Sequence, residues 1–287
     1  IAGLSSAYYA IKQSKAQGRS LRVTVLESSA HWGGKIVTDR VALDGGQFVV
    51  EGGPDTFLAT KPWGVALCRE LGLEGRLHGT NPHRKNTYVL HRNHLRMLPD
   101  GLAMMIPTNV QAILKTSLIS WPGKARMGLD FILPPVPPNG DESLGAFVGR
   151  RLGREAYENL IEPLMSGIYA GDGDALSLAS TFPYLRDLEL KYGSLARGAF
   201  KMRQQAAGKA TVGSRSAFLT PETGLGEIIE ALVADLEQNQ VVLRLQSPVA
   251  RIYQDGAGYG VELESSAVLH ADHLILATPA YVSGALV

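Results

Sequence analysis

A glycine and a carboxylate near the start of the chain have the spacing of a nucleotide-binding unit. Gly3 opens a helical pattern of apolar residues over 4–14, and Glu27 directly follows the apolar, β-branched run 21–26. In such units an acid about 20 residues after the glycine loop accepts hydrogen bonds from ribose hydroxyls, and the helix start faces the pyrophosphate. With one glycine of the loop in view, an ordinary strand–helix unit explains this pattern equally well.

Two further glycine clusters follow where a cofactor would need bare backbone. The Gly-Gly-Lys triplet 33–35 places two glycines beside a positive charge, which suits a phosphate. The segment 51–56 reads Glu-Gly-Gly-Pro-Asp-Thr. Each cluster alone is also explained by a tight turn, since Gly, Pro and Asp are turn formers. All three motifs in this order favour a nucleotide cofactor.

Together these segments resemble the fingerprint of the large FAD-containing oxidase superfamily, which includes amine oxidases, phytoene desaturases and porphyrinogen oxidases. The Gly-Gly-basic triplet has no counterpart in the plain NAD fingerprint, so the resemblance implies FAD as the cofactor. It also implies a set of cofactor-binding residues: Ile1, Ala2, Gly3, Glu27, Ser28, Lys35, Gly53, Pro54, Asp55, Thr56 and Val249. The segment 277–279 matches the return to the nucleotide domain.

A longer string in the middle of the chain resembles one family in that superfamily, the porphyrinogen oxidases of haem biosynthesis. Residues 159–172 read Asn-Leu-Ile-Glu-Pro-Leu-Met-Ser-Gly-Ile-Tyr-Ala-Gly-Asp, and 98–101, 131–134 and 176–183 continue the likeness. The most similar branch is the oxygen-dependent one of Gram-positive bacteria, which oxidises coproporphyrinogen III and in many cases protoporphyrinogen IX. The resemblance implies that the flavin takes hydride equivalents from the porphyrinogen and that O2 reoxidises the flavin, giving H2O2.

The same resemblance implies a substrate cavity lined by residues of this string. Ser166, Gly167 and Tyr169 match positions that line it. Gly167 would present bare backbone to a flat macrocycle, whereas the plainer interpretation is that it only lets a helix end. No general acid or base is assigned, because the chemistry belongs to the cofactor and the protein supplies binding, orientation and electrostatics.

One position departs from the family pattern. Thr87 stands where mitochondrial-type members carry an arginine that is proposed to hold a substrate propionate, and a threonine cannot form a bidentate pair with a carboxylate. Other cationic side chains would therefore be needed to bind the propionates. Arg84 and Lys85 are candidates, together with Arg92 and Arg96, although a solvated surface loop explains each of them as well.

The elements that must position these residues give a mixed α/β (α+β) fold with a discontinuous, Rossmann-like FAD-binding domain. We expect residues 1–85 to form its first part and residues 86–208 a largely helical substrate insertion. Residues 209–287 would return to the FAD-binding domain and begin a β-rich substrate domain. Helices are predicted at 143–151, 154–161 and 228–238, strands at 87–90, 95–98, 217–220, 241–245, 249–253, 259–263 and 273–276, and a polar linker at 204–208.

Composition excludes several function classes. The chain has 287 residues, 45% of them hydrophobic, and a net charge of +1, which is ordinary for a globular protein and argues against nucleic acid as the main partner. The seven histidines show no metal-ligand spacing, so no metal site is expected. The one cysteine, Cys68, fits a core position in a helix and a reducing, cytoplasmic compartment.

The segment 102–129 combines apolar and basic residues and contains no acidic residue. Such a segment is typical of peripheral contact with the inner face of a membrane, but we favour the interpretation that it walls an apolar porphyrin pocket. No apolar run approaches the roughly 18 residues of a spanning helix. The expected partners are the porphyrinogen and O2, with handover to the next haem-pathway enzyme as a further one.

Two other function classes remain open. A different flavin oxidase, of the amine oxidase or phytoene desaturase type, would lack the string 166–172. A non-catalytic flavin-fold binding protein would have no need of Glu27, Lys35 and the 53–56 loop. The chain also looks truncated at both ends. We therefore expect the function to belong to a longer parent protein and this piece alone not to hold FAD.

Overall fold

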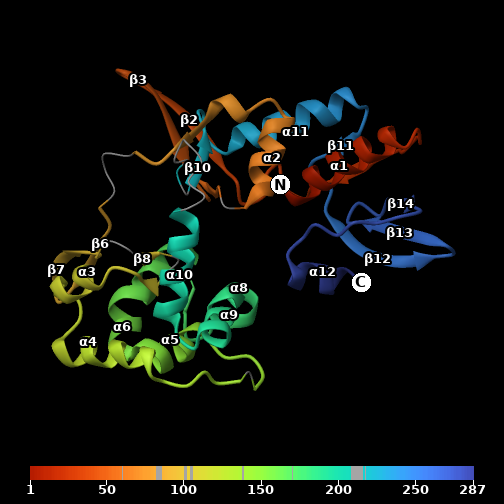
Figure 1. Ribbon diagram of the computed structural model, residues 1–287. Coiled ribbons are helices and arrows are strands. Elements are labelled where there is room, and N and C mark those ends of the chain that lie inside the picture. Colours follow the sequence, from red (N-terminus) through yellow and green to blue (C-terminus); the bar gives the residue numbers. More distant parts are fainter. Residues whose placement is uncertain are drawn as a thin grey trace. The chain divides into compact units, whose positions relative to one another are not determined.

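The computed structural model describes residues 1–59, 61–81, 86–99, 102–103, 106–137, 139–169, 171–207, 216 and 218–287. They form two compact units (Figure 1). The first combines Ile1–Thr80 with Arg215–Val287, and the second is Asn81–Ser214.

The first unit mixes helices and strands. Its helical segments are α1 (Ala2–Ala16), α2 (Pro62–Glu70), the 3-10 turn η1 (Glu74–Arg76), α11 (Gly226–Gln238) and α12 (Ala280–Leu286). Its strands are β1 (Thr24–Leu26), β2 (Thr38–Leu43), β3 (Gly46–Glu51), β4 (Phe57–Leu58), β5 (Leu77–Gly79), β10 (Phe218–Pro221), β11 (Val242–Arg244), β12 (Val249–Asp255), β13 (Gly258–Leu263) and β14 (Val268–Ala271).

A parallel strand pair and two packed helices form the centre of this unit. β1 and β11 run parallel, with Val25 opposite Leu243, and α1 packs along α11 (Figure 1). The apolar residues of α1 recur at helical spacing, so they form one buried stripe. That stripe shares a hydrophobic core with α2 and α11: Leu4, Ala7, Tyr8, Ile11, Leu67, Cys68, Ile228, Ile229, Leu232 and Leu236.

Antiparallel pairs complete the first unit. β4, β10 and β5 form one sheet in that order, and β12, β13 and β14 form another. β2 and β3 form a hairpin that Figure 1 shows projecting as a ribbon, and its turn at Gly45 and Gly46 has φ of +110° and +153°, which favours glycine.

The second unit is largely helical. Its strands are β6 (Tyr88–His91), β7 (His94–Met97), β8 (Leu102–Ala103) and β9 (Ile106–Pro107). Its helical segments are α3 (Val110–Lys115), α4 (Trp121–Gly128), η2 (Leu129–Phe131), α5 (Leu144–Leu152), α6 (Arg154–Ala156), η3 (Tyr157–Ile161), α7 (Glu162–Tyr169), α8 (Leu178–Thr181), α9 (Pro183–Tyr192) and α10 (Leu195–Ala207).

Local signals set the ends of these helices. Asn109, Ser120 and Ser143 stand before α3, α4 and α5, and each side chain accepts a hydrogen bond from an amide of the first turn. Gly153 ends α5 with φ +95°, and Gly193 ends α9 with φ +70°. The segment η3 is a π-helical turn, a feature often found near functional sites.

Most predicted elements are confirmed, and three expectations were wrong. The run 21–26, expected to form one strand, forms a strand only over β1, where Thr24–Leu26 pair with β11. Residues 273–276 form no strand, and Ile275 is 64% exposed: an apolar pattern alone does not supply a pairing partner. Residues 204–207 continue α10 instead of forming a linker, since Gln and Ala are good helix formers.

Candidate functional site

The start of α1 meets two other segments of the predicted cofactor site. A Cβ on Gly3 would lie 3.4 Å from the Cβ of Ala277, so glycine lets the helix approach the segment 277–279 closely. The Ile1 amino group donates to the Gly33 carbonyl at 3.5 Å. The structure therefore places Ile1, Ala2 and Gly3 where the second glycine motif begins.

Glu27 follows β1, and only one of its two carboxylate oxygens accepts hydrogen bonds from the described residues. Its amide donates to the Arg244 carbonyl at 2.9 Å, which fixes it beside β11. The Oε1 atom accepts from the Ser29 amide at 2.9 Å and from the Ser28 hydroxyl at 3.3 Å. The Oε2 atom has no hydrogen-bond partner within the described part of the chain. A half-buried carboxylate with a free acceptor oxygen can take hydrogen bonds from ribose hydroxyls.

Val249 begins β12, and the residues before it bring the chain to the Glu27 turn. The amides of Gln246 and Ser247 donate to the carbonyls of Ser29 at 3.0 Å and Glu27 at 2.9 Å. The pairing of β12 with β13 shifts register directly after Val249. Irregular strand starts of this kind re-aim backbone groups next to binding sites.

The Gly-Gly-Lys segment makes a turn that glycine alone accepts without strain. Gly33 and Gly34 have φ of +114° and +63°. A Cβ on Gly33 would lie 2.7 Å from the Ile36 carbonyl oxygen and 3.4 Å from the Ile229 side chain of α11, whereas one on Gly34 would meet nothing within 4 Å. Lys35 is exposed beside them. Gly33 is buried and Gly34 is exposed, so the turn offers bare backbone next to a cation at Gly34.

The loop that begins at Gly52 lies directly against this turn. The Gly52 amide donates to the Val37 carbonyl at 2.8 Å. Any Cβ on Gly53 would overlap the Lys35 carbonyl group, so only glycine allows the two segments to approach this closely. The remaining predicted loop residues are exposed or half-buried: Pro54, Asp55 and Thr56.

These segments fit a dinucleotide cofactor, and the fit rests on backbone space. A side chain at position 53 would fill the close approach between the two glycine motifs, and one at position 33 would collide with the Ile36 carbonyl of its own turn. Amides at a helix start and a nearby cation are groups that suit a pyrophosphate, and a carboxylate such as Glu27 suits a ribose, so the roles of these residues stay predictions. All of these groups belong to the first unit.

The predicted substrate residues of the second unit lie on α7. The Ser166 hydroxyl donates to the Pro163 carbonyl at 3.4 Å, and the Tyr169 ring packs edge-on against Phe182 at 5.3 Å between ring centres. Gly167 lies inside α7, and a Cβ there would meet nothing within 4 Å. The interpretation that Gly167 ends a helix was therefore wrong. Its contact with a macrocycle stays a prediction.

The residues predicted for propionate binding are only partly described. Thr87 is exposed directly before β6, and its carbonyl accepts from the Leu98 amide at 2.8 Å. Arg92 occupies the turn between β6 and β7 with φ +48°. Arg84 and Lys85 lie outside the described residues, so their role stays a prediction.

A buried ion pair that sequence reasoning missed ties several segments of the second unit together. Arg151 and Asp130 are both fully buried, and the Arg151 Nε atom donates to Asp130 Oδ1 at 2.7 Å. The guanidinium also donates to the carbonyls of Leu133, Pro134 and Gly193 at 3.2, 3.1 and 2.8 Å. The sequence pattern could have indicated this burial, because Arg151 falls at helical spacing among the apolar residues of α5.

Glu189 extends this cluster from α9. Its two carboxylate oxygens accept from Arg150 at 2.6 and 2.9 Å, and Oε1 also accepts from the Val136 amide at 3.2 Å. Burial alone would raise the pKa of Glu189, yet these hydrogen bonds outweigh it and hold the pKa below its usual value. The carboxylate therefore stays charged inside the fold.

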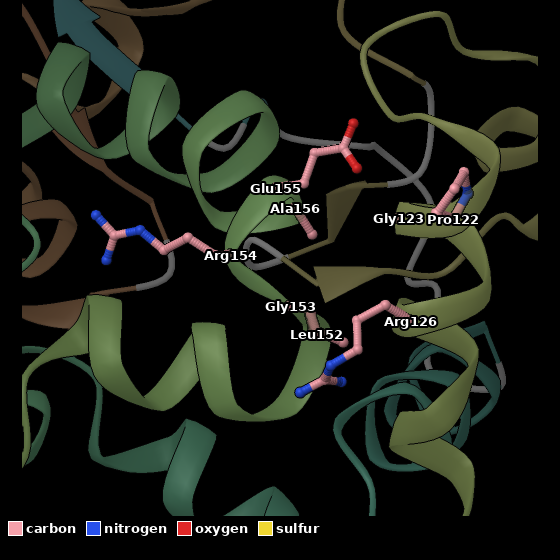
Figure 2. A pocket seen from close by; sticks show the side chains of 8 residues that line it. All are labelled: Pro122, Gly123, Arg126, Leu152, Gly153, Arg154, Glu155 and Ala156. Atoms are coloured by element: carbon pink, nitrogen blue, oxygen red, sulfur yellow. The ribbon is translucent and has the colours of Figure 1, made fainter.

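A pocket of about 260 Å³ lies between α4, α5 and α6 (Figure 2). Its charged groups are already used by the protein. Arg126 lies against Gly153 and donates to the Arg150 carbonyl at 2.8 Å, and Glu155 accepts from the Ser120 hydroxyl at 2.7 Å. This pocket is therefore a helix junction in which the charged side chains of Arg126 and Glu155 are already paired with other described residues.

Other chemistries find little support in the described residues. Burial raises the pKa of the Cys68 thiol to about 11, so it is no nucleophile at neutral pH. Within the described residues no group of His, Cys, Asp and Glu could hold a metal ion. No helix among those residues is long and apolar enough to cross a membrane.

Comparisons with known proteins agree with this geometry. A family model described as flavin containing amine oxidoreductase matches residues 1–286. The chain is 41% identical over 280 residues to coproporphyrinogen III oxidase of Bacillus subtilis (strain 168), which covers 97% of this chain and 58% of that protein. It is 37% identical over 287 residues to coproporphyrinogen III oxidase of Staphylococcus aureus (strain NCTC 8325 / PS 47), covering 97% and 59%.

A solved structure is similar over nearly the whole chain. This is a protein from Exiguobacterium sp. 255-15 that carries the provisional name protoporphyrinogen oxidase, with a TM-score of 0.78 and 31% identity. The match covers 99% of this chain and 59% of that one. The chain thus spans less than two thirds of the length of the proteins it matches.

Proposed function

This chain belongs to the flavin containing amine oxidoreductase family, and we propose that its parent protein is an FAD-dependent porphyrinogen oxidase of haem biosynthesis. The proposed reaction converts coproporphyrinogen III to coproporphyrin III, protoporphyrinogen IX to protoporphyrin IX, or both, with O2 as acceptor and H2O2 as product. The observation that carries the proposal is the close packing of the 52–56 loop on the Gly-Gly-Lys turn beside Glu27. Similarity to coproporphyrinogen III oxidases over 97% of the chain supports the substrate class.

The cofactor domain is proposed to be Rossmann-like and discontinuous. The parallel pair of β1 and β11, with α1 leading into β1, supports the first point. The compact unit built from Ile1–Thr80 and Arg215–Val287 supports the second, with boundaries proposed near residues 85 and 208. The segment between them would carry the substrate residues.

The residues of this chain would bind and orient the cofactor rather than transfer protons. Amides at the start of α1 and at Gly33 and Gly34 would hold the pyrophosphate, with Lys35 as a counter-charge. Glu27 would accept from the ribose, and the 53–56 loop would lie along the flavin. When bound, the flavin supplies hydride acceptance from the porphyrinogen and electron transfer to O2.

The substrate would be held by shape and by its carboxylates. The open surface at Gly167 suits one face of a macrocycle, because no side chain occupies that space. Thr87 cannot pair bidentately with a propionate, so Arg84 and Lys85 are proposed for this task. We infer that coproporphyrinogen III, with its four propionates, is the preferred substrate.

Two matched substrates test this function in the full-length parent protein. Purified protein that contains FAD is mixed in air with coproporphyrinogen III or with protoporphyrinogen IX, and porphyrin fluorescence is followed with time. We expect fluorescence to rise with both, faster with coproporphyrinogen III, and H2O2 to appear in step. A flavin-containing protein that oxidises neither substrate faster than a protein-free control would refute the proposal.

The proposed setting is the cytoplasm, with handover of the porphyrin to the next haem-pathway enzyme. In the segment 102–129 Trp121 is 70% exposed, with the Lys124 ammonium 4.6 Å from its ring centre. We favour a pocket wall over peripheral membrane contact for this segment. Full-length protein that fails to float with anionic liposomes would agree, and flotation would show the membrane contact instead.

A further inference from the structure

Glu51 lies directly before the 52–56 loop and makes contacts that the proposed reaction does not require. Glu51 ends β3, and its cross-strand partner in the hairpin is Thr38 at the start of β2. The Thr38 hydroxyl donates to Glu51 Oε2 at 2.5 Å. Both side chains therefore lie on one face of the hairpin and act as a single polar unit.

This unit lies at the beginning of α11. The Leu225 amide donates to Glu51 Oε1 at 2.6 Å, and the Gly226 amide donates to the Thr38 hydroxyl at 2.8 Å. The first amides of a helix have no partners within the helix, and its dipole favours a negative charge there. Residues from another part of the chain thus cap α11.

Two glycines leave space for this cap. Gly224 has φ +91°, and a Cβ on it would lie 2.5 Å from Thr38 Cγ2 and 2.6 Å from Glu51 Oε1. A Cβ on Gly226 would lie 2.9 Å from the Thr38 Cβ. A side chain at position 224 would push both Thr38 and the Glu51 carboxylate away from the helix start, and one at position 226 would push Thr38 away. The β2–β3 hairpin can therefore bring Thr38 and Glu51 to the start of α11 because positions 224 and 226 carry no side chain.

The same helix contacts the other glycine motif. Ile229, on the first turn of α11, lies 3.4 Å from the position of a Cβ on Gly33. Glu51 is joined through the backbone to Gly52 and Gly53, which pack on Val37 and Lys35. α11 thus contacts the Gly-Gly-Lys turn directly and holds the 52–56 loop through Glu51.

We propose that Glu51, together with Thr38, is a positioning residue that sets the 52–56 loop against the cofactor by anchoring it to the start of α11. This rests on the proposed FAD site. Glu51 itself touches no cofactor in this account and acts through the loop that follows it. Loss of either anchor frees the end of β3 and lets the loop move relative to the Gly-Gly-Lys turn.

The test uses the full-length protein, stripped of flavin and titrated with FAD. Thr38→Val keeps the shape of the side chain but removes its hydroxyl, and Glu51→Gln removes the charge. Thr38→Ser keeps the hydroxyl and is the conservative variant. Glu230→Gln is the matched control, because the exposed pair of Arg40 with Glu230, at 2.8 Å, joins the same hairpin to the same helix. The readouts are the FAD dissociation constant and the midpoint potential of the bound flavin.

We expect Thr38→Val and Glu51→Gln to weaken FAD binding about tenfold to a hundredfold, the range for a lost charge-assisted hydrogen bond. The midpoint potential should shift in both variants. Thr38→Ser and Glu230→Gln should stay within about twofold of the wild-type dissociation constant, with an unchanged potential.

Three results would overturn the proposal. Wild-type affinity and potential in both Thr38→Val and Glu51→Gln would show that the loop needs no anchor, while leaving the proposed function intact. Loss of near-ultraviolet circular dichroism in both flavin-free variants would show that the pair holds the fold instead of the loop. A wild-type protein that binds no FAD would remove the proposed function as well.

Discussion

At the scale of single residues, the sharpest constraint in the molecule is the absence of a side chain at Gly53. Its would-be Cβ overlaps the carbonyl of Lys35, which is backbone and cannot rotate away. We expect Gly53→Ala to destabilise the full-length protein by roughly 1–3 kcal/mol, the usual cost of overpacking, and to lower flavin content. Denaturant unfolding and the ratio of flavin to protein absorbance measure the two effects.

Gly75 provides the control for that substitution. It lies in the short turn η1, and a Cβ there would meet nothing within 4 Å. Gly75→Ala should change stability by no more than about 0.5 kcal/mol and leave flavin content unchanged. Equal stability and flavin content in the two alanine variants would contradict the close packing of the two glycine motifs.

Glu227 provides a pH-dependent contribution to stability. Its hydrogen bond with Arg76, aided by the Thr223 hydroxyl at 2.7 Å, lowers the pKa of Glu227 to about 2. Because the folded pKa lies below the unfolded value of about 4.3, this stabilisation is present above that pH and is lost as the pH falls towards 2. Its size is at most about 3 kcal/mol, reduced by solvent screening of the half-exposed Arg76.

Arg76→Gln tests this titration in the flavin-free, full-length protein. The variant should be less stable than wild type at pH 6, and the difference should shrink as the pH is lowered from 4.5 to about 2. Arg69→Gln, which breaks an exposed pair with Glu74 nearby, should give a small difference with little pH dependence. If the free energies of unfolding of wild type and Arg76→Gln differed by the same amount at every pH, the result would contradict the lowered pKa of Glu227.

Gly167 separates stability from substrate binding. In a helix interior Gly→Ala stabilises by about 0.5–1 kcal/mol, and the open space at Gly167 leaves no clash inside the protein. If a macrocycle lies over this surface, Gly167→Ala should raise the unfolding midpoint and lower kcat/KM for coproporphyrinogen III by about tenfold or more. Gly149→Ala in α5, equally open, should only stabilise. A gain in stability without loss of kcat/KM would remove Gly167 from the substrate site.

At the scale of helices and strands, the Arg151 cluster decides how the second unit is assembled. From α5 it joins η2, the loop after it and the junction between α9 and α10. Arg151→Met leaves the buried Asp130 carboxylate without its cation, which typically costs about 3–5 kcal/mol. The urea midpoint of the full-length protein measures this loss.

Arg154→Met is the companion variant. Arg154 pairs with Asp174 at 2.7 Å on the surface, with the side chains 55% and 43% exposed. Exposed pairs contribute about 0–1 kcal/mol, so this variant should unfold close to wild type. Similar midpoints for the two methionine variants would show that the buried cluster does not stabilise the unit.

Periodicity predicted the elements that bury one face. α1, α5 and α11 carry apolar residues at helical spacing, and the strands from β10 to β13 were found to within a few residues. The β2–β3 hairpin was not predicted. Its apolar residues Val41, Leu43, Phe48 and Val50 are all exposed, so the hairpin has no buried face of the kind that periodicity indicates. Residues 273–276 were predicted to form a strand because several of them are apolar, but they pair with no strand among the described residues.

At the scale of the whole molecule, the motifs proposed to bind the cofactor could be read from the sequence, whereas the long-range contacts that support them could not. Glycine motifs and the ribose acid are visible as local spacing, and the structure brings Gly3, Glu27, Gly33 and Gly53 into neighbouring segments of one unit. The cap of α11 by Glu51 and Thr38 joins residues that are far apart in the chain, since Leu225 lies 174 positions after Glu51. Local spacing carries no signal of such a contact.

The central claim is that the parent protein uses its flavin to oxidise a porphyrinogen. The direct measurement is an anaerobic titration of the full-length flavoprotein with coproporphyrinogen III, followed by admission of O2. We expect the oxidised flavin absorbance to bleach without O2, with at most one porphyrin formed for every three flavins reduced, because each porphyrinogen gives up three hydride equivalents and each flavin accepts one. The oxidised absorbance should return, with H2O2, when O2 enters. A flavin that stays oxidised in the presence of excess coproporphyrinogen III and protoporphyrinogen IX would contradict this claim.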